Sequence, residues 1–166
     1  MRRGYDREGY LAKIRELRAR IPEICLGTDV IVGFPTETEE DFQQTLSLLH
    51  EVDYDTVYSF AYSARPGTVA PSLGPDLSDD LKFERLARLN AIQKSIQERR
   101  NRAWIGRSVE VLVEGPNRRN ANEWTGRTAG ARWVHFAGDS AAGRIELVEI
   151  AQASAFCLRG EIVVGT

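Results

Sequence analysis

Cysteine and histidine are scarce in this sequence, which limits the metal chemistry that the chain itself can provide. Its 166 residues include two cysteines, Cys25 and Cys157, which lie far apart and form no CxxC or CxxxCxxC motif. The chain therefore carries neither a zinc motif nor an iron–sulfur motif, and we interpret both cysteines as reduced, buried apolar residues. His50 and His135 have no acidic partner at a recognisable spacing and are interpreted as structural or surface residues. We therefore predict no catalytic residue and no metal ligand from the sequence.

Long apolar runs are also lacking. No run approaches the roughly 20 apolar residues that are needed to cross a bilayer. Residues 1–10 begin with basic side chains but contain no apolar stretch, so we expect no secretory signal, no membrane partner and a cytoplasmic location. Hydrophobic residues make up 42% of the chain and charged residues 28%, a composition that is typical of globular proteins and argues against disorder.

The charges nearly balance overall but are distributed unevenly along the chain. Residues 1–98 contain 12 Lys and Arg against 17 Asp and Glu, whereas residues 99–166 contain 10 against 7. The basic excess lies in eight arginines: Arg99, Arg100, Arg102, Arg107, Arg118, Arg119, Arg127 and Arg132. Arginine pairs with phosphate through two N–H groups and stacks on bases, which favours an RNA or DNA partner. On charge alone, a solvated face near a domain junction explains the cluster equally well.

Residues 28–42, TDVIVGFPTETEEDF, predict a strand, a glycine turn and a helix. Val30–Val32 is a β-branched run typical of strands that are buried on both faces of a parallel sheet, and Gly33 ends it. Thr36 or Thr38 can cap the helix that follows. Such a turn either holds a small polar or anionic ligand at its backbone N–H groups or is a plain βα connection, and both interpretations stay open.

The front part of the chain alternates between helix and strand. The expected elements are a helix that Asp6 can cap and that runs to about Ile21, a strand from Cys25 to Val32, a helix from Glu39 to Val52, a strand from Thr56 to Tyr62 and a long helix from Ser78 to Trp104. This order predicts an α/β fold with a parallel sheet, whose two strand ends and following loops lie at one edge. Because two strands are too few for a stable parallel sheet, we expect this part to lack neighbouring elements.

After Gly106 the hydrophobic pattern changes to period two, which is typical of half-buried strands. Five short strands are expected, near residues 108–114, 123–128, 132–136, 144–150 and 156–164. They predict a small OB-like antiparallel β-barrel. Its aromatic and basic residues interleave as in single-stranded RNA recognition. These residues are Trp124, Arg127, Arg132, Trp133, His135 and Phe136. Core packing can explain any single aromatic ring among them.

The ordered motifs TDVIVGFPTETEEDF, YSARPGT, VEVLVEG, TGRTAGARWVHF and LRGEIV resemble the C-terminal half of the MiaB-type tRNA methylthiotransferases. The resemblance covers essentially the whole chain. It implies that residues 1–103 form the last part of a radical S-adenosylmethionine α/β barrel and that residues 104–166 form a TRAM β-barrel. It also implies methylthiolation of isopentenyladenosine beside the tRNA anticodon, with S-adenosylmethionine and iron–sulfur clusters whose ligands are not in this chain. We therefore expect the chain to be a fragment that is inactive alone.

The resemblance also implies the residues of the cofactor site, whereas the expected RNA contacts come from the arginine cluster and from the interleaved aromatic and basic residues of the barrel. The residues expected at the S-adenosylmethionine site are Ile31, Gly33, Phe34, Ser63, Arg65 and Pro66. The residues expected to contact RNA are Arg118, Arg119, Arg127, Arg132, Trp133 and Phe136. One departure is Thr36, which replaces the second glycine of the family pattern GFPGET, and we interpret Thr36 as a helix cap.

Several alternatives remain at this stage. Related branches of the family modify threonylcarbamoyladenosine or a ribosomal protein, but the segment GRTAGARWVHF favours the isopentenyladenosine branch. A second hypothesis from a different class is a non-catalytic RNA-binding module, which rests on the barrel and the arginines alone. The expected partner is the anticodon stem-loop of tRNA, and the expected oligomeric state is a monomer.

Overall fold

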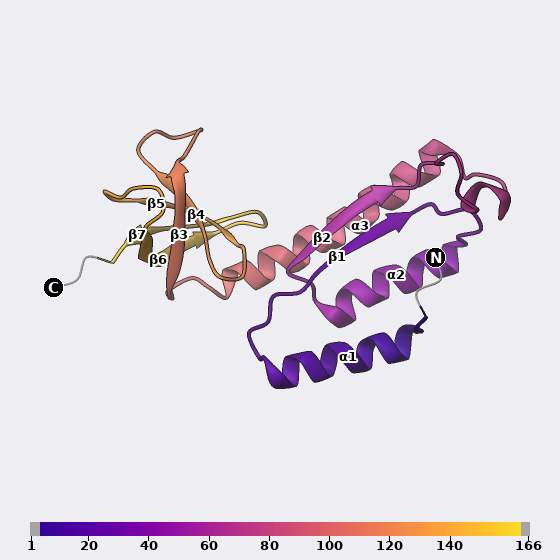
Figure 1. Cartoon of the computed structure of the whole chain (residues 1–166), viewed down its shortest axis with the longest axis horizontal. Helices are drawn as coiled ribbons and strands as arrows, with labels where there is room; N and C mark the ends of the chain where they lie inside the picture. Colours follow the sequence, from indigo (N-terminus) through magenta and orange to yellow (C-terminus); the bar gives the residue numbers. More distant parts are fainter. Residues whose placement is uncertain (1–3, 164–166) are drawn as a thin grey trace. The chain divides into compact units, whose positions relative to one another are not determined.

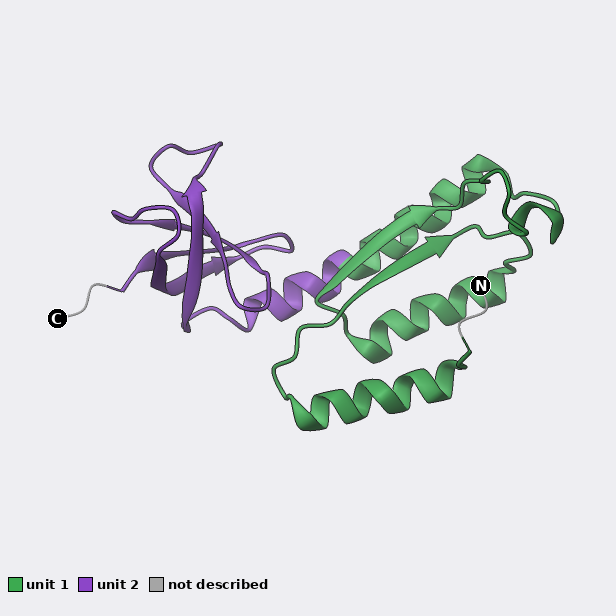
Figure 2. Cartoon of the chain, in the orientation of Figure 1, with its two compact units in different colours: residues 1–93 green, residues 94–166 purple. Residues whose placement is uncertain are grey.

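The computed structural model describes residues 4–163, which form two compact units. Among the described residues, the first unit ends at residue 93 and the second begins at residue 94, so that the division lies within one long helix (Figure 2). The boundary at residues 103 and 104 that the sequence suggested stays a prediction. Each unit is described by itself below. No helix within the described range combines the length and the apolar character that a membrane crossing needs.

The first unit is an α/β arrangement (Figure 1). Its elements are α1 (Arg7–Arg20), β1 (Gly27–Val32), α2 (Glu39–Val52), β2 (Thr56–Ala61), the 3₁₀ turn η1 (Ala70–Ser72) and the first part of α3 (Asp79–Arg102). Asp6 caps α1 as predicted, because its Oδ1 accepts a hydrogen bond from the Gly9 amide at 2.8 Å. The predicted order of helices and strands is confirmed.

The strands β1 and β2 pair in parallel, as the sequence predicted. The Tyr62 amide donates to the Val32 carbonyl oxygen at 2.8 Å, so the loops that follow the two strands begin side by side. One face of this sheet is exposed, and its register places Ile31 opposite Phe60. Burial of Val30–Val32 on both faces is therefore wrong: Val32 is fully buried, but Ile31 points to the uncovered face.

The N-terminus of α2 is capped by Thr38 rather than by Thr36. The Thr38 hydroxyl oxygen accepts from the Asp41 amide at 3.1 Å, and the Asp41 carboxylate accepts from the Thr38 amide at 2.9 Å, which completes a capping box. Thr36 lies in the preceding turn with a φ of 77°, in the left-handed region that favours glycine. The interpretation of Thr36 as a cap is therefore wrong, because Thr36 lies within a turn in which the Glu37 amide donates to the Phe34 carbonyl oxygen at 2.8 Å.

The second unit contains the end of α3 and a closed five-stranded barrel. Its strands are β3 (Ser108–Pro116), β4 (Trp124–Arg127), β5 (Trp133–Ala137), β6 (Ile145–Ala153) and β7 (Leu158–Ile162), in the closed order β3-β4-β5-β7-β6. The predicted α/β part followed by a small OB-like barrel is confirmed. The barrel is mixed rather than purely antiparallel, because β6 pairs with β3 and leaves the edge of β5 to pair in parallel with β7.

Trp124 of β4 packs against the barrel core, whose buried, inward side chains come from β3, β5, β6 and β7. These are Val109, Val111, Val113, Val134, Phe136, Val148, Ile150 and Leu158. Two glycines allow the strands to approach closely. A Cβ at Gly126 would overlap the carbonyl oxygen of Leu112, and a Cβ at Gly160 would overlap that of Glu149. The interior is therefore a packed apolar core, and any ligand must bind on the outer surface.

Candidate nucleic-acid interface

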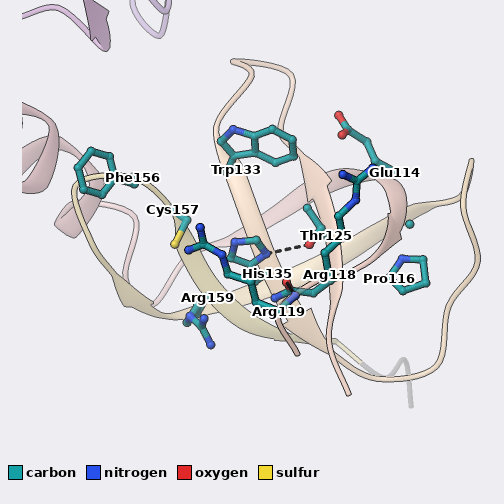
Figure 3. A pocket seen from close by; sticks show the side chains of 12 residues that line it. Glu114, Pro116, Arg118, Arg119, Thr125, Trp133, His135, Phe156, Cys157 and Arg159 are labelled. Atoms are coloured by element: carbon teal, nitrogen blue, oxygen red, sulfur yellow. Dashed lines mark hydrogen bonds between the residues drawn. The ribbon is translucent and has the colours of Figure 1, made fainter. Parts of the chain in front are cut away.

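A groove of about 800 Å³ lies on the outer surface of the barrel (Figure 3). Its lining comes from the end of β3, the β3–β4 loop, β4, β5, the β6–β7 turn and β7. The residues that line this barrel groove are Glu114, Gly115, Pro116, Asn117, Arg118, Arg119, Thr125, Trp133, His135, Phe156, Cys157 and Arg159. Three of the predicted RNA-binding residues, Arg118, Arg119 and Trp133, therefore lie together in one depression.

The β3–β4 loop is held in place by Asn117, which is only 8% exposed. Its Nδ2 donates to Glu123 Oε2 at 2.8 Å, and its Oδ1 accepts from the Arg119 amide at 3.0 Å. Arg118 and Arg119 follow directly and are exposed. Neither guanidinium forms an ion pair with any residue between 4 and 163. The loop thus presents two uncompensated positive charges from a fixed backbone.

The floor of the barrel groove is built by a row of side chains across three strands. In the strand register, Thr125 lies opposite His135, and His135 lies opposite Arg159. Arg159 also pairs with Glu123 at 2.6 Å. His135 Nδ1 is 2.8 Å from the Thr125 hydroxyl oxygen (Figure 3). Burial lowers the pKa of His135, and the positive charge of Arg159 lowers this pKa further, so the imidazole is neutral at pH 7.

Trp133 provides an aromatic surface at the rim of the barrel groove, where its side chain lies in Figure 3. The residue is 37% exposed. The Arg127 Cζ atom lies 3.7 Å from the centroid of the Trp133 ring, and Arg127 Nε donates to Glu114 Oε1 at 3.0 Å. Phe156 is 69% exposed and gives the groove a second aromatic ring. The groove therefore combines arginines with exposed rings, the chemistry that binds phosphate and bases.

Three predicted RNA-binding residues do not line the barrel groove: Arg127, which lies over the Trp133 ring, Arg132 and Phe136. Arg132 Nε donates to Asn101 Oδ1 at 3.3 Å, its Cζ lies 5.0 Å from the Trp104 ring centroid, and it does not line the groove. Phe136 is 1% exposed and belongs to the barrel core. This placement corrects the assignment of Phe136 as a contact, because a buried ring has no face to offer to a base. The contact role of Arg132 stays a prediction.

The predicted cofactor residues lie at the strand ends of the first unit. Ile31 and Phe34 line a shallow depression of about 280 Å³ together with Thr36, Glu37 and Asp41. Gly33 does not line it. Its amide donates to Glu37 Oε2 at 2.7 Å, and a Cβ at this position would collide with the aliphatic stem of Lys82. Gly33 thus has a demonstrated packing role, and its contact with a cofactor stays a prediction.

The loop after β2 carries the other predicted cofactor residues, Ser63, Arg65 and Pro66, and all three are exposed. Arg65 has no ion-pair partner in the described part of the chain. Behind this loop, the Tyr62 ring packs edge-on against Phe34 with 5.3 Å between centroids. The Tyr62 hydroxyl is buried and has no hydrogen-bond partner within residues 4–163. The two strand-end loops are therefore neighbours, as the sequence predicted.

Sequence reasoning placed His135 in the aromatic and basic cluster of the barrel but proposed no contact role for Asn117, Phe156 or Arg159, which also line the barrel groove. The outward direction of His135 follows from its alternation with the buried Val134 and Phe136. The place of Arg159 could not be predicted, because its position beside His135 depends on the parallel pairing of β5 with β7. Local patterns do not reveal such a long-range pairing.

Comparison with known proteins agrees with this geometry. Residues 102–163 match the TRAM domain family. The similar proteins include relatives named tRNA-2-methylthio-N(6)-dimethylallyladenosine synthase, three of which are the following. The relative from Methylacidiphilum infernorum is 53% identical over 128 residues, 77% of this chain and 27% of the relative. The relative from Moorella thermoacetica is 45% identical over 166 residues, 99% of this chain and 37% of the relative. The relative from Clostridium botulinum strain Okra is 43% identical over 97% of this chain and 36% of the relative.

The chain therefore spans about a third of the length of the curated relatives that it matches. The match extends over both units in the Moorella relative, because it includes 99% of the chain. By sequence, the chain is a relative of the MiaB-type tRNA methylthiotransferases and contains a TRAM domain.

Proposed function

We propose that this chain takes part in the methylthiolation of isopentenyladenosine beside the tRNA anticodon and that its barrel docks the tRNA. The observation that carries the proposal is the barrel groove within the TRAM match. There, Arg118 and Arg119 present uncompensated charge beside the exposed ring of Trp133. The names of the relatives support the choice of substrate. Guanidinium groups bind backbone phosphates, and an exposed indole stacks on unpaired bases.

The first unit is proposed to supply part of the S-adenosylmethionine site. The residues fit one wall of such a site. Ile31 offers an exposed aliphatic surface for an adenine ring, and Arg65 offers a guanidinium for a carboxylate. The orphan Tyr62 hydroxyl between the two strand-end loops is a further polar group that lacks an internal partner within the described residues. Phe34, Ser63 and Pro66 complete the proposed wall.

In the family, S-adenosylmethionine and the iron–sulfur clusters supply the radical and sulfur-transfer chemistry. The residues of this chain are proposed to bind and orient: the strand-end loops hold the cofactor, and the barrel holds the RNA. The two cysteines have no cluster spacing, so we expect the 166-residue chain not to catalyse the reaction alone. The alternative of a non-catalytic RNA-binding module rests on the same groove, because phosphate and base binding need no cofactor.

The experiment is a fluorescence-anisotropy titration of the full chain with an anticodon stem-loop that carries isopentenyladenosine. Duplex DNA is the control, and both are measured over a series of salt concentrations. We expect tighter binding to the stem-loop, with an affinity that falls as salt rises because phosphate contacts release counterions. Equal, weak binding to both polyanions would overturn the proposal of tRNA docking. A matched stem-loop without the isopentenyl group separates recognition of the modified base from recognition of the stem-loop fold.

A further inference from the structure

The two faces of the Trp133 ring lie in different environments. Arg127 and Trp133 are directly opposite each other on β4 and β5, so the guanidinium lies over one face of the indole at 3.7 Å. Arg127 does not line the barrel groove, whereas Trp133 and Glu114 do. The ring is therefore held by Arg127 on one side and contributes its remaining exposed surface to the groove.

The charge of Arg127 is already compensated. Its Nε donates to Glu114 Oε1 at 3.0 Å, and both side chains are less than half exposed, at 40% and 44%. Arg118 and Arg119 differ, because neither forms an ion pair within residues 4–163. An arginine that is paired with a carboxylate and stacked on a ring has little free charge to offer to phosphate. Its geometry is instead suited to fixing the indole, because a planar guanidinium stacks well on an aromatic face.

We propose that the barrel groove binds one unpaired ribonucleotide, with its base stacked on the groove surface of Trp133 and its phosphate bound by Arg118 and Arg119. Arg127 and Glu114 are positioning residues that fix the Trp133 ring and do not contact the RNA. This inference rests on the proposed function that the barrel binds RNA. It goes further, because it names the form of RNA that fits the groove and changes the role of Arg127 from a phosphate contact to a support.

The arrangement selects against duplex RNA. In a duplex each base is stacked on its neighbours, so its face is not available to the indole. A strand with unpaired bases can place one base on the ring while its backbone lies along the arginine loop. Base stacking on an aromatic side chain tolerates any sequence, since each base has a π-face. We therefore expect preference for single strands with little preference among bases.

The test is a set of anisotropy titrations of the full chain with three labelled probes of equal length. The probes are oligouridylate, an abasic ribose-phosphate strand and duplex RNA. Arg127→Met, Arg127→Lys and Trp133→Leu are compared with Arg118→Met, which serves as the matched phosphate-contact variant. Salt dependence is measured for each pair, because phosphate contacts contribute to the salt slope and stacking does not. Circular dichroism verifies that each variant is folded, and Arg127→Lys replaces Arg127→Met if the latter unfolds.

The expected results separate the two kinds of arginine. Arg118→Met weakens the binding of oligouridylate and of the abasic strand alike and reduces the salt slope by about one. Trp133→Leu and Arg127→Met each weaken oligouridylate binding about tenfold, leave its salt slope unchanged and leave abasic-strand binding unchanged. Arg127→Lys does not restore affinity, because a lysine ammonium is not planar. In the Trp133→Leu background, Arg127→Met has no further effect.

Two outcomes would overturn the inference. A salt slope reduced by about one in Arg127→Met, with equal losses for both strands, would make Arg127 a phosphate contact. Unchanged oligouridylate affinity in Trp133→Leu would exclude stacking. Failure of the unmodified chain to bind either these RNA probes or the anticodon stem-loop is a different result, because it would overturn the proposed function itself.

Discussion

At the residue scale, Thr36 is a β-branched residue whose backbone adopts a conformation that favours glycine. Its φ is 77°. The left-handed region costs a β-branched residue more conformational free energy than most other residues, because its side chain contacts the adjacent peptide groups. The helix that follows gains nothing from Thr36, since Thr38 and Asp41 form the capping box. The strain at Thr36 is therefore not compensated by a capping hydrogen bond.

We predict that Thr36→Gly stabilises the chain. Glycine adopts positive φ without steric cost, and its greater freedom in the unfolded chain offsets part of the gain, which leaves a net increase of about 1 kcal/mol in the free energy of unfolding. Urea denaturation of the full chain measures it. The matched control is Thr36→Ala, which keeps a Cβ and should show a much smaller gain. A decrease for Thr36→Gly would mean that contacts of the threonine side chain, such as its approach to Gly74, outweigh the strain.

At the scale of elements, the β3–β4 loop shows how one buried amide organises a binding surface. Asn117, at the start of the loop, donates to the carboxylate of Glu123 at its end and accepts from the Arg119 amide within it. Glu123 in turn pairs with Arg159 on β7. The position of Arg118 and Arg119 therefore depends on a hydrogen-bond network that crosses from the loop to a strand distant in sequence.

We predict that Asn117→Ala lowers both the free energy of unfolding and the affinity for RNA. Removal of the buried amide leaves the Arg119 amide without its acceptor, at a cost of about 1–2 kcal/mol, and allows the arginine loop to move. Urea denaturation and anisotropy titration with oligouridylate measure the two effects. The matched control is Asn122→Ala in the same loop, where the side chain is exposed. Equal effects of the two substitutions would show that Asn117 has no special role in ordering the loop.

The sequence predicted most elements of both units because their local signals agree with their environments. The alternation in β3 and the cap at Asp6 are examples, since each depends only on neighbouring residues. The errors arose where the environment of a side chain was not inferred correctly from its type. Burial of Ile31 was expected from its apolar character, but burial depends on a covering layer that a sequence pattern does not contain. Phe136 was assigned to the surface from composition, although its alternation with His135 places it in the core.

The candidate site was predicted less completely than the fold. Arg118, Arg119 and Trp133 were found from residue type alone, because charge and aromaticity are visible in the sequence. The groove that joins them depends on closure of the barrel, in which β5 pairs with β7 across an intervening strand in the chain order. The stacking of Arg127 on Trp133 likewise depends on the register between β4 and β5, which a sequence pattern does not contain.

At the scale of the whole molecule, the two units differ in how their strands are supported. Each barrel strand has two hydrogen-bonded neighbours, because the barrel is closed. The sheet of the first unit has two strands, so each has one neighbour among the described residues. One face of this sheet is covered, as the burial of Val32 and Phe42 shows, and the other exposes Ile31 and Phe60. Two-stranded sheets depend on packing for their stability, and half of the possible packing surface is open here.

We predict that hydrogen exchange separates the two units. The amides in the β1–β2 ladder should exchange through local opening at a free energy below that of the barrel strands, because fewer hydrogen bonds and less apolar burial oppose their opening. Exchange of the full chain, followed by mass spectrometry of peptides, measures this difference. The internal comparison is between peptides that contain Val32 and Val134, since both side chains are fully buried and differ chiefly in the support of their strands. Equal protection of the two peptides would show that the helices alone stabilise β1 and β2 as fully as closure stabilises the barrel.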